Sequence, residues 1–150
     1  SFWTWSDAVV DFARLNCRLH TAFGWTTHVG ENANHRSLRN FPMQANGAEM
    51  LRLACCLATE RGVRVCAPIH DAILIEARLD DLEEAVLRAK SAMEESSAAV
   101  LGGFRLRSDA KLIRFPDRYS DERGARMWKK VRGIVDELEP TTRDVAHTRQ

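Results

Sequence analysis

The stretch V-R-V-C-A-P-I-H-D-A-I-L-I-E-A, from Val63 to Ala77, contains two short apolar runs on either side of His70 and Asp71. The first run alternates apolar and other side chains, and the second is rich in branched aliphatic residues. Two such runs around a short gap predict an antiparallel β-hairpin. His and Asp both tolerate the backbone angles of tight turns. The stretch therefore predicts a rigid hairpin that carries an imidazole and a carboxylate at its tip.

A row of polar residues lies upstream of the hairpin. Arg36, Asn40 and Gln44 follow one another at intervals of four, which would place them on one face of a helix. Pro42 lies within the row, so a loop that leads into a helix beginning near Asn40 or Phe41 is an equally good interpretation. The row is therefore predicted either on a helical face or at a helix entrance.

The rest of the chain alternates between helical and strand patterns. The segment from residue 43 to 59 is apolar on nearly every side, which predicts a buried helix, and Gly62 is a typical helix end. Further helices are expected at residues 6–20, 79–101 and 121–138, with Ser6 as the first cap, and further strands at 23–28 and 104–112. Antiparallel strands covered by helices predict the α+β class. We expect one domain over residues 1–138 and a flexible tail over 139–150.

The composition fits a globular protein and sets limits on function. A chain of 150 residues can bury a core. Its 22 basic and 21 acidic residues give a net charge of +1, which is less basic than a dedicated nucleic-acid binder. There is no apolar run of membrane-spanning length and no signal peptide, so no membrane association is expected. The chain opens on Ser1 and a run of aromatic residues, as a segment of a longer protein would.

Four cysteines are present, and their spacing argues against a metal site. They are Cys17, Cys55, Cys56 and Cys66. None forms a C-x-x-C pair, and three fall in apolar segments. We interpret them as buried free thiols in a reducing compartment, and we expect neither a zinc site nor disulfides.

The order Arg-x-x-x-Asn-x-x-x-Gln, then a helix, then strand–His-Asp–strand resembles the C-terminal half of the palm in family A DNA polymerases, the bacterial DNA polymerase I type. The resemblance covers residues 24–114. It implies an antiparallel palm-type sheet with a central His-Asp hairpin, covered by long helices on one face. It also implies template-directed DNA synthesis in the cytoplasm of a bacterial cell or a phage-infected host. The segment from Asp109 onward is more similar to phage- or plasmid-borne members than to the cellular repair enzyme.

The resemblance assigns roles to five residues. Asp71 would be the catalytic carboxylate, and His70 would lie near the primer strand. Nucleotidyl transfer uses two Mg²⁺ ions about 4 Å apart, and Asp71 would supply one carboxylate ligand. Arg36, Asn40 and Gln44 would contact primer–template DNA. Every base pair presents acceptors at similar places in the minor groove, so long donors there can check pair geometry without reading sequence. The partners implied are primer–template DNA and a dNTP.

The chain departs from the family pattern in several places. The family has an acid after the hairpin Asp, where Ala72 stands here. The second catalytic Asp, the N-terminal palm and the finger helix would lie in upstream regions that this chain does not contain. Asp109 is a possible local carboxylate, on a strand that could lie beside the hairpin. The isolated chain is therefore predicted to be inactive.

Two interpretations from other classes stay open. One is a non-catalytic α+β remnant or assembly module that retains the palm scaffold, which Ala72 and the near-neutral charge support. The other is an unrelated hydrolase that uses His70 and Asp71. No nucleophile stands at a recognisable spacing for that chemistry, so the polymerase interpretation leads.

Overall fold

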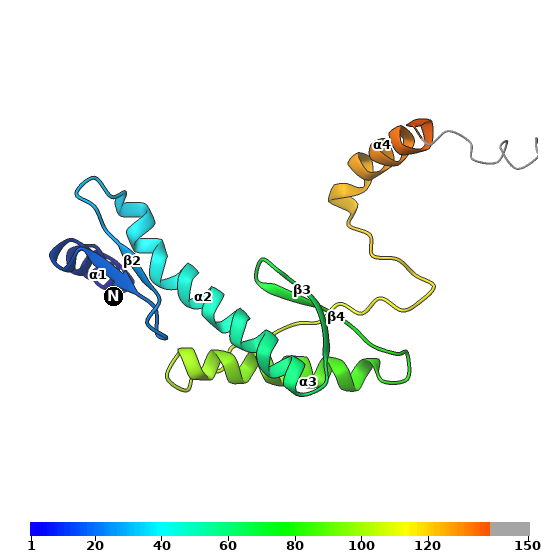
Figure 1. Ribbon diagram of the computed structural model, residues 1–150, viewed down its shortest axis with the longest axis horizontal. Helices are drawn as coiled ribbons and strands as arrows, with labels where there is room; N and C mark the ends of the chain where they lie inside the picture. Colours follow the sequence, from blue (N-terminus) through cyan, green and yellow to red (C-terminus); the bar gives the residue numbers. More distant parts are fainter. Residues whose placement is uncertain (139–150) are drawn as a thin grey trace, which may run out of the picture. The chain divides into compact units, whose positions relative to one another are not determined.

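The computed structural model describes residues 1–138 of the chain and is α+β, as predicted (Figure 1). The elements in chain order are α1 (Phe2–Asn16), β1 (Arg18–His20), β2 (Thr26–His28), α2 (His35–Glu60), β3 (Arg64–Ile69), β4 (Ala72–Glu76), α3 (Leu82–Val100) and α4 (Glu122–Leu138). The chain divides into two compact units at residues 111 and 112. The first unit holds α1 to α3, and α4 belongs to the second. The predicted tail, residues 139–150, lies outside the described residues.

Helix α1 begins earlier in the sequence than its pattern predicted. Ser1 is the N-cap, and its Oγ accepts a hydrogen bond of 3.4 Å from the backbone N–H of Thr4. Ser6, the predicted cap, is a buried helical residue instead. The helix ends at Asn16, and not at His20, because Cys17 adopts a left-handed conformation with φ 53° and turns the chain into β1.

Helix α2 also begins before its predicted start near Asn40. Asn34 is the N-cap, and its Oδ1 accepts from the backbone N–H of Arg36 at 2.8 Å. Pro42 lies inside the helix. It is the eighth residue of α2, beyond the first four whose N–H groups have no partner within a helix, so the helix continues there with one backbone hydrogen bond missing. The loop interpretation is therefore wrong, and the helical one is confirmed. Gly62, with φ 73°, follows the helix end as predicted.

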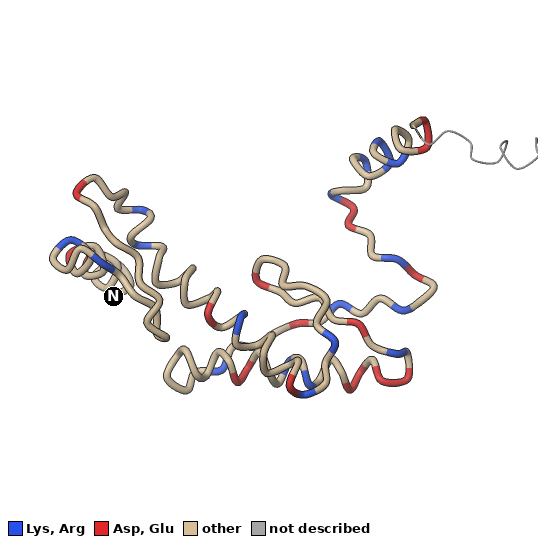
Figure 2. The backbone as a smooth tube through the Cα atoms, in the orientation of Figure 1, with Lys and Arg blue, Asp and Glu red and all other residues tan. Residues whose placement is uncertain are grey.

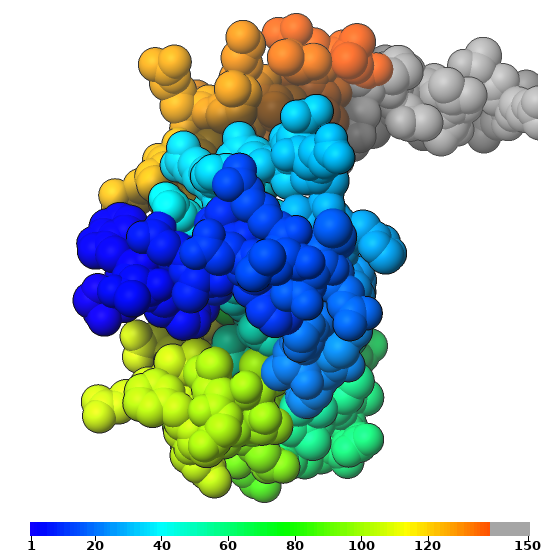
Figure 3. Space-filling view, turned by 90° about the vertical axis from the view of Figure 1, so that its left-hand side faces the viewer, coloured from blue at the N-terminus to red at the C-terminus, as the bar shows by residue number. Residues whose placement is uncertain are grey.

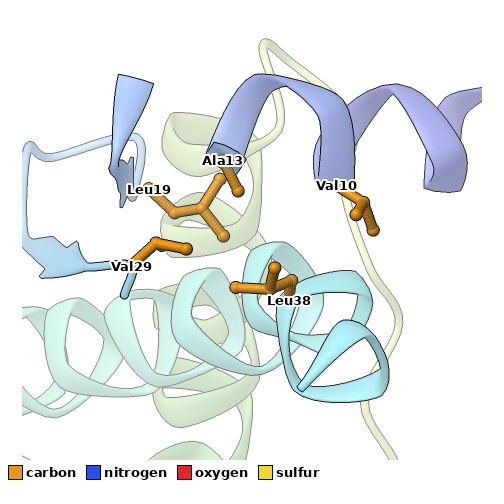
Figure 4. Packing of buried hydrophobic residues seen from close by; sticks show 5 residues of the cluster. All are labelled: Val10, Ala13, Leu19, Val29 and Leu38. Carbon is orange, nitrogen blue, oxygen red and sulfur yellow. The ribbon is translucent and has the colours of Figure 1, made fainter. Parts of the chain in front are cut away.

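One hydrophobic cluster joins α1, the β1–β2 hairpin and the first half of α2. Its buried members point toward one another in Figure 4 and are Val10, Ala13, Leu19, Val29 and Leu38. Strands β1 and β2 pair antiparallel, with Arg18 opposite His28. Burial of this aliphatic surface holds the short hairpin in place, because two isolated strands are only marginally stable in water.

A second cluster joins the end of α2, the β3–β4 hairpin and α3. Its buried members are Ala58, Val63, Ala89 and Ala92, with Val65, Ile73 and Ile75 of the hairpin packed against them. Alanines at the contact allow the elements to approach closely. Between residues 43 and 59 only Glu49, Ala54 and Ala58 are buried. The prediction of a helix buried on nearly every side is therefore wrong, because each half of α2 packs against a different cluster.

The strand predicted at residues 104–112 is not present. Gly102 and Gly103 both have positive φ and end α3 in a turn. The backbone N–H of Leu106 then donates to Ser97 Oγ of α3 at 2.9 Å and does not pair with a strand. The described strands form two separate two-stranded sheets. A palm-type sheet therefore stays a prediction for this chain.

The four cysteines are free thiols, as predicted, but they are not buried. Cys17, Cys56 and Cys66 are exposed, and Cys55 is half-buried. Cys55 and Cys56 lie on α2, whose two halves pack against different clusters and leave part of its surface open.

Candidate functional site

The β3–β4 hairpin presents His70 and Asp71 on a two-residue turn. Ile69 pairs with Ala72, so the strands meet directly on either side of the turn. His70 has φ 55°, a left-handed angle that His adopts more readily than branched residues do. A register shift lies between Val65 and Ala67, near the base of the hairpin. The hairpin predicted from the sequence is confirmed, including the place of its turn.

The side chains at the tip are open to solvent. Asp71 is 91% exposed and His70 is 86% exposed. His70 Nδ1 lies 3.6 Å from Asp71 Oδ1, which is longer than a hydrogen bond. Such an exposed contact contributes little to stability. The carboxylate of Asp71 is thus mounted on a rigid hairpin and faces outward, as predicted, where an external cation can reach it.

The base of the hairpin carries a second carboxylate with a different environment. Glu76 pairs across the strands with Arg64, and its Oε1 lies 2.8 Å from Arg64 Nη1. This cross-strand ion pair holds Glu76 away from the tip and gives it a structural role. Asp109, the other carboxylate considered above, does not lie on a strand.

The donor set around Asp71 fits magnesium only in part. In residues 1–138, no group of three or more His, Cys, Asp or Glu side chains could hold a metal ion. Mg²⁺, however, is commonly bound through one or two carboxylates, with water and substrate phosphates completing the shell. A single exposed carboxylate is therefore consistent with one ligand from this chain, and the other ligands would come from elsewhere.

The row of Arg36, Asn40 and Gln44 lies on α2, and all three side chains are exposed. Asn40 and Ala58 are 18 positions apart, which is about five full turns of helix. The two residues therefore face in about the same direction. Since Ala58 packs against the β3–β4 hairpin and α3, the row lies on the side of α2 that receives the hairpin. That the row and Asp71 open onto one groove stays a prediction.

The structure also contains a pocket that was not identified as a site from the sequence. A pocket of about 240 Å³ is lined by residues of α1, β1 and α2, among them Trp5, Phe12 and His20. The signal that could have found the pocket is the helical spacing of Trp5, Ala8 and Phe12, which places them on one stripe of α1.

Part of the chain is similar to bacterial DNA polymerase I. It is 30% identical over 105 residues to the thermostable DNA polymerase I of Thermus caldophilus, and equally to that of Thermus thermophilus. Each match covers 61% of this chain and 13% of the relative's length. No family model matches the chain, and no solved structure matches it.

The extent of these matches places the hairpin within the similar segment. A continuous segment with 61% of the 150 residues spans about 91 positions. Wherever it begins, it must include residues 60–91, at the centre of the chain, and therefore all of β3 and β4.

Among the described residues, no helix combines the length and the apolar character that a membrane-spanning helix needs.

Proposed function

We propose that this chain is the C-terminal palm portion of a family A DNA polymerase and that it takes part in template-directed DNA synthesis. The observation that carries the proposal is the exposed carboxylate of Asp71 on a two-residue turn, within a segment similar to DNA polymerase I. The chain spans 13% of the relatives it matches. Activity would therefore require the rest of a polymerase, and the isolated chain would be inactive.

Asp71 is the residue proposed to act in catalysis. When bound, two Mg²⁺ ions neutralise charge on the transferring phosphoryl group and orient the primer hydroxyl. Asp71 would hold one or both ions through its exposed carboxylate, and a second carboxylate from outside this chain would complete the site. His70 lies beside it and can donate a hydrogen bond to a primer phosphate.

The row on α2 is proposed to contact the primer terminus. Arg36, Asn40 and Gln44 all carry donors, and acceptors recur at similar places in the minor groove of every base pair. Their common face and their exposure support a contact that does not depend on base sequence. Their position on the hairpin side of α2 supports a shared groove with Asp71.

Two observations favour a second candidate function. Ala72 follows Asp71 where the family has an acid, and no further carboxylate joins Asp71 in a metal-binding group within residues 1–138. These features fit a non-catalytic remnant or assembly module that retains the scaffold. In that case the longer polypeptide would not extend a primer, and substitution of Asp71 would have no effect on activity.

The test is Asp71→Asn in the polypeptide that joins this chain to an upstream palm and fingers. The substitution keeps the side-chain size and removes the negative charge. Primer extension should fall by several orders of magnitude, because the lost interaction matters most as charge develops in the transition state. Primer–template affinity should change little, since it depends chiefly on basic contacts to phosphates.

Glu76→Gln is the matched control. It removes a carboxylate from the same hairpin, but one that pairs with Arg64. Extension by this variant should stay near the wild-type rate. Wild-type extension by Asp71→Asn, or equal losses in both variants, would reject the catalytic role of Asp71.

A further inference from the structure

Helix α4, in the second unit of the chain, carries an apolar stripe on its surface. Four apolar side chains follow one another at intervals of four, three and four residues, so they share one side of the helix. They are Met127, Val131, Ile134 and Leu138, and they are between 39% and 74% exposed. Figure 3 shows side chains of this segment, in orange, at the surface. An exposed apolar stripe of this kind marks an interaction site.

The two edges of the stripe differ in chemistry. Trp128 and Val135 lie seven positions apart along one edge and widen the apolar surface. Lys130 and Glu137 lie seven positions apart along the other edge. Neither has an oppositely charged residue three or four positions away, where a pair within the helix would form. A partner that supplies one charge of each sign at this edge would therefore satisfy both.

Charge is also distributed unevenly along α4. Apart from Glu122 at the start, its acidic residues lie in the last turn, and its five basic residues precede them (Figure 2). Asp136 pairs with Arg132 of the same helix at 3.5 Å, which leaves Glu137 as the acidic group beside the stripe. Two such helices side by side in the same direction would set basic part against basic part. The opposite direction brings the acidic end of each helix to the basic part of the other and opposes the two helix dipoles.

We propose that α4 binds the α4 of a second copy of this chain as an antiparallel helix pair. When Val131 of each copy lies against Ile134 of the other, Met127 meets Leu138 and the stripe forms four apolar layers. Alternating intervals of three and four residues are the spacing that lets two helices interdigitate along such a seam. The interface is isologous, since the same surface of both copies is used and every contact occurs twice.

The same register pairs the charges that flank the stripe. Lys130 of one copy lies level with Glu137 of the other copy, and symmetry forms this pair twice. On the opposite edge, Trp128 packs against Val135 of the other copy. In a parallel pair, Lys130 would face Val135 and Glu137 would gain no contact with Lys130. The flanking charges therefore specify the antiparallel orientation.

An anionic membrane surface fits this helix less well. It would attract the basic residues of α4, as it does in amphipathic helices that lie on membranes, but it would repel Glu137 at the edge of the stripe. A second copy satisfies both Lys130 and Glu137. The proposed contact involves neither Asp71 nor the Arg36, Asn40 and Gln44 row, so it goes beyond the proposed polymerase function.

Sedimentation equilibrium of the 150-residue chain over a range of concentrations measures the self-association. The wild-type chain should approach twice its monomer mass, with a dissociation constant in the micromolar range, because the paired surface is small for a specific interface. Val131→Asp should weaken the association at least about 100-fold, since it places an unpaired carboxylate in the seam from each copy.

Charge reversal tests the register. Lys130→Glu and Glu137→Lys should each weaken the association by roughly tenfold, because each converts two attractive pairs into two repulsive ones. The double variant restores both pairs and should associate as the wild type does. An equimolar mixture of the two single variants should also form dimers, since each supplies the charges that the other lacks.

The control is Lys129→Glu, which reverses a charge on the side of α4 away from the stripe. It should change the dissociation constant by less than about twofold. Circular dichroism verifies that each variant is folded. Recovery in the double variant also separates a direct contact from a folding defect, because a loss of helix would not be reversed by a second substitution at the opposite charge.

Several outcomes would overturn the proposal. They are a wild-type chain that stays monomeric at every concentration, a Val131→Asp variant that associates like the wild type, and a double variant that does not recover. Binding of a monomeric wild-type chain to vesicles of anionic phospholipid would assign the stripe to a membrane surface instead. Asp71→Asn should leave self-association unchanged, so a failure of the polymerase proposal would be visible separately from a failure of this one.

Discussion

Thr21 Oγ1 donates a hydrogen bond of 2.9 Å to Glu49 Oε1 in the interior of the first unit. Thr21 is 2% exposed and Glu49 is 1% exposed. Glu49 also forms an ion pair with Arg52, one turn further along α2. The interaction ties the end of the β1–β2 hairpin to the middle of α2. A buried carboxylate is stable only when its partners are in place.

The first prediction follows from that dependence. Thr21→Val should lower the free energy of unfolding by about 1–3 kcal/mol, because it leaves one oxygen of Glu49 buried without a donor. Glu49→Ala should lower it by about 3 kcal/mol, because it also leaves a cavity. Urea denaturation of both single variants and of the double variant measures the coupling. If the two losses simply added, the buried hydrogen bond would not be a source of stability.

The second prediction concerns the close contact between α2, α3 and the hairpin. Ala92 is fully buried in the cluster with Ala58 and Val63. Ala92→Leu should destabilise the protein by roughly 1–3 kcal/mol or more, because a larger side chain must push the elements apart. Ala99→Leu, at an exposed position of the same helix, serves as the control and should change stability by less than about 0.5 kcal/mol. Equal midpoints of thermal unfolding in the two variants would contradict the packing described here.

The β3–β4 hairpin could be predicted from the sequence because the residues that specify its strands and its turn are close together in the chain. Alternating apolar residues and turn-tolerant His70 and Asp71 specify the strands and the turn without any distant partner. Helix starts were less predictable. Ser6 and Asn40 both have capping side chains, but Ser1 and Asn34 are the caps in the fold, and no local rule distinguishes them.

Features that depend on distant contacts could not be predicted. The alternation over residues 104–112 satisfies the strand pattern, yet Ser97 of α3 takes the backbone N–H of Leu106. Glu49 is buried in α2, and its hydrogen bond with Thr21, which is 28 residues away in the sequence, helps to explain that burial. The same limit applies to the site. The row on α2 could be placed on one face from its spacing, but its orientation relative to the hairpin depends on how Ala58 packs.

The third prediction concerns the reactivity of the thiols. Burial raises the pKa of Cys55, and the neighbouring Cys56 thiol raises it further. The thiolate is the reactive form of cysteine. At pH 8, a smaller fraction of Cys55 is therefore thiolate than would be the case for a cysteine with the ordinary pKa. Iodoacetamide should modify the exposed Cys17, Cys56 and Cys66 before Cys55. Peptide mass spectrometry over a time course measures the order, and modification of Cys55 first would show that α2 opens locally in solution.

The last prediction tests the row on α2 in the longer polypeptide that contains the upstream palm and fingers. Gln44 is exposed, carries two donors and lies on the hairpin side of α2. If it contacts the minor groove at the primer terminus, Gln44→Ala should slow extension by about tenfold, the effect of one hydrogen bond on the barrier. Because acceptors recur there in every base pair, the loss should be similar for every template sequence. Matched and mismatched termini should both be affected.

Single-turnover extension from primers that end in each of the four bases provides the measurement. Met43→Ala is the control, because Met43 is an exposed neighbour that points about 100° away around the helix. It should extend at the wild-type rate. A loss confined to one terminal base pair would indicate sequence reading and contradict the geometric role. A wild-type rate in Gln44→Ala would remove the row from the primer site while leaving the role of Asp71 intact, since Asp71 is tested by its own substitution.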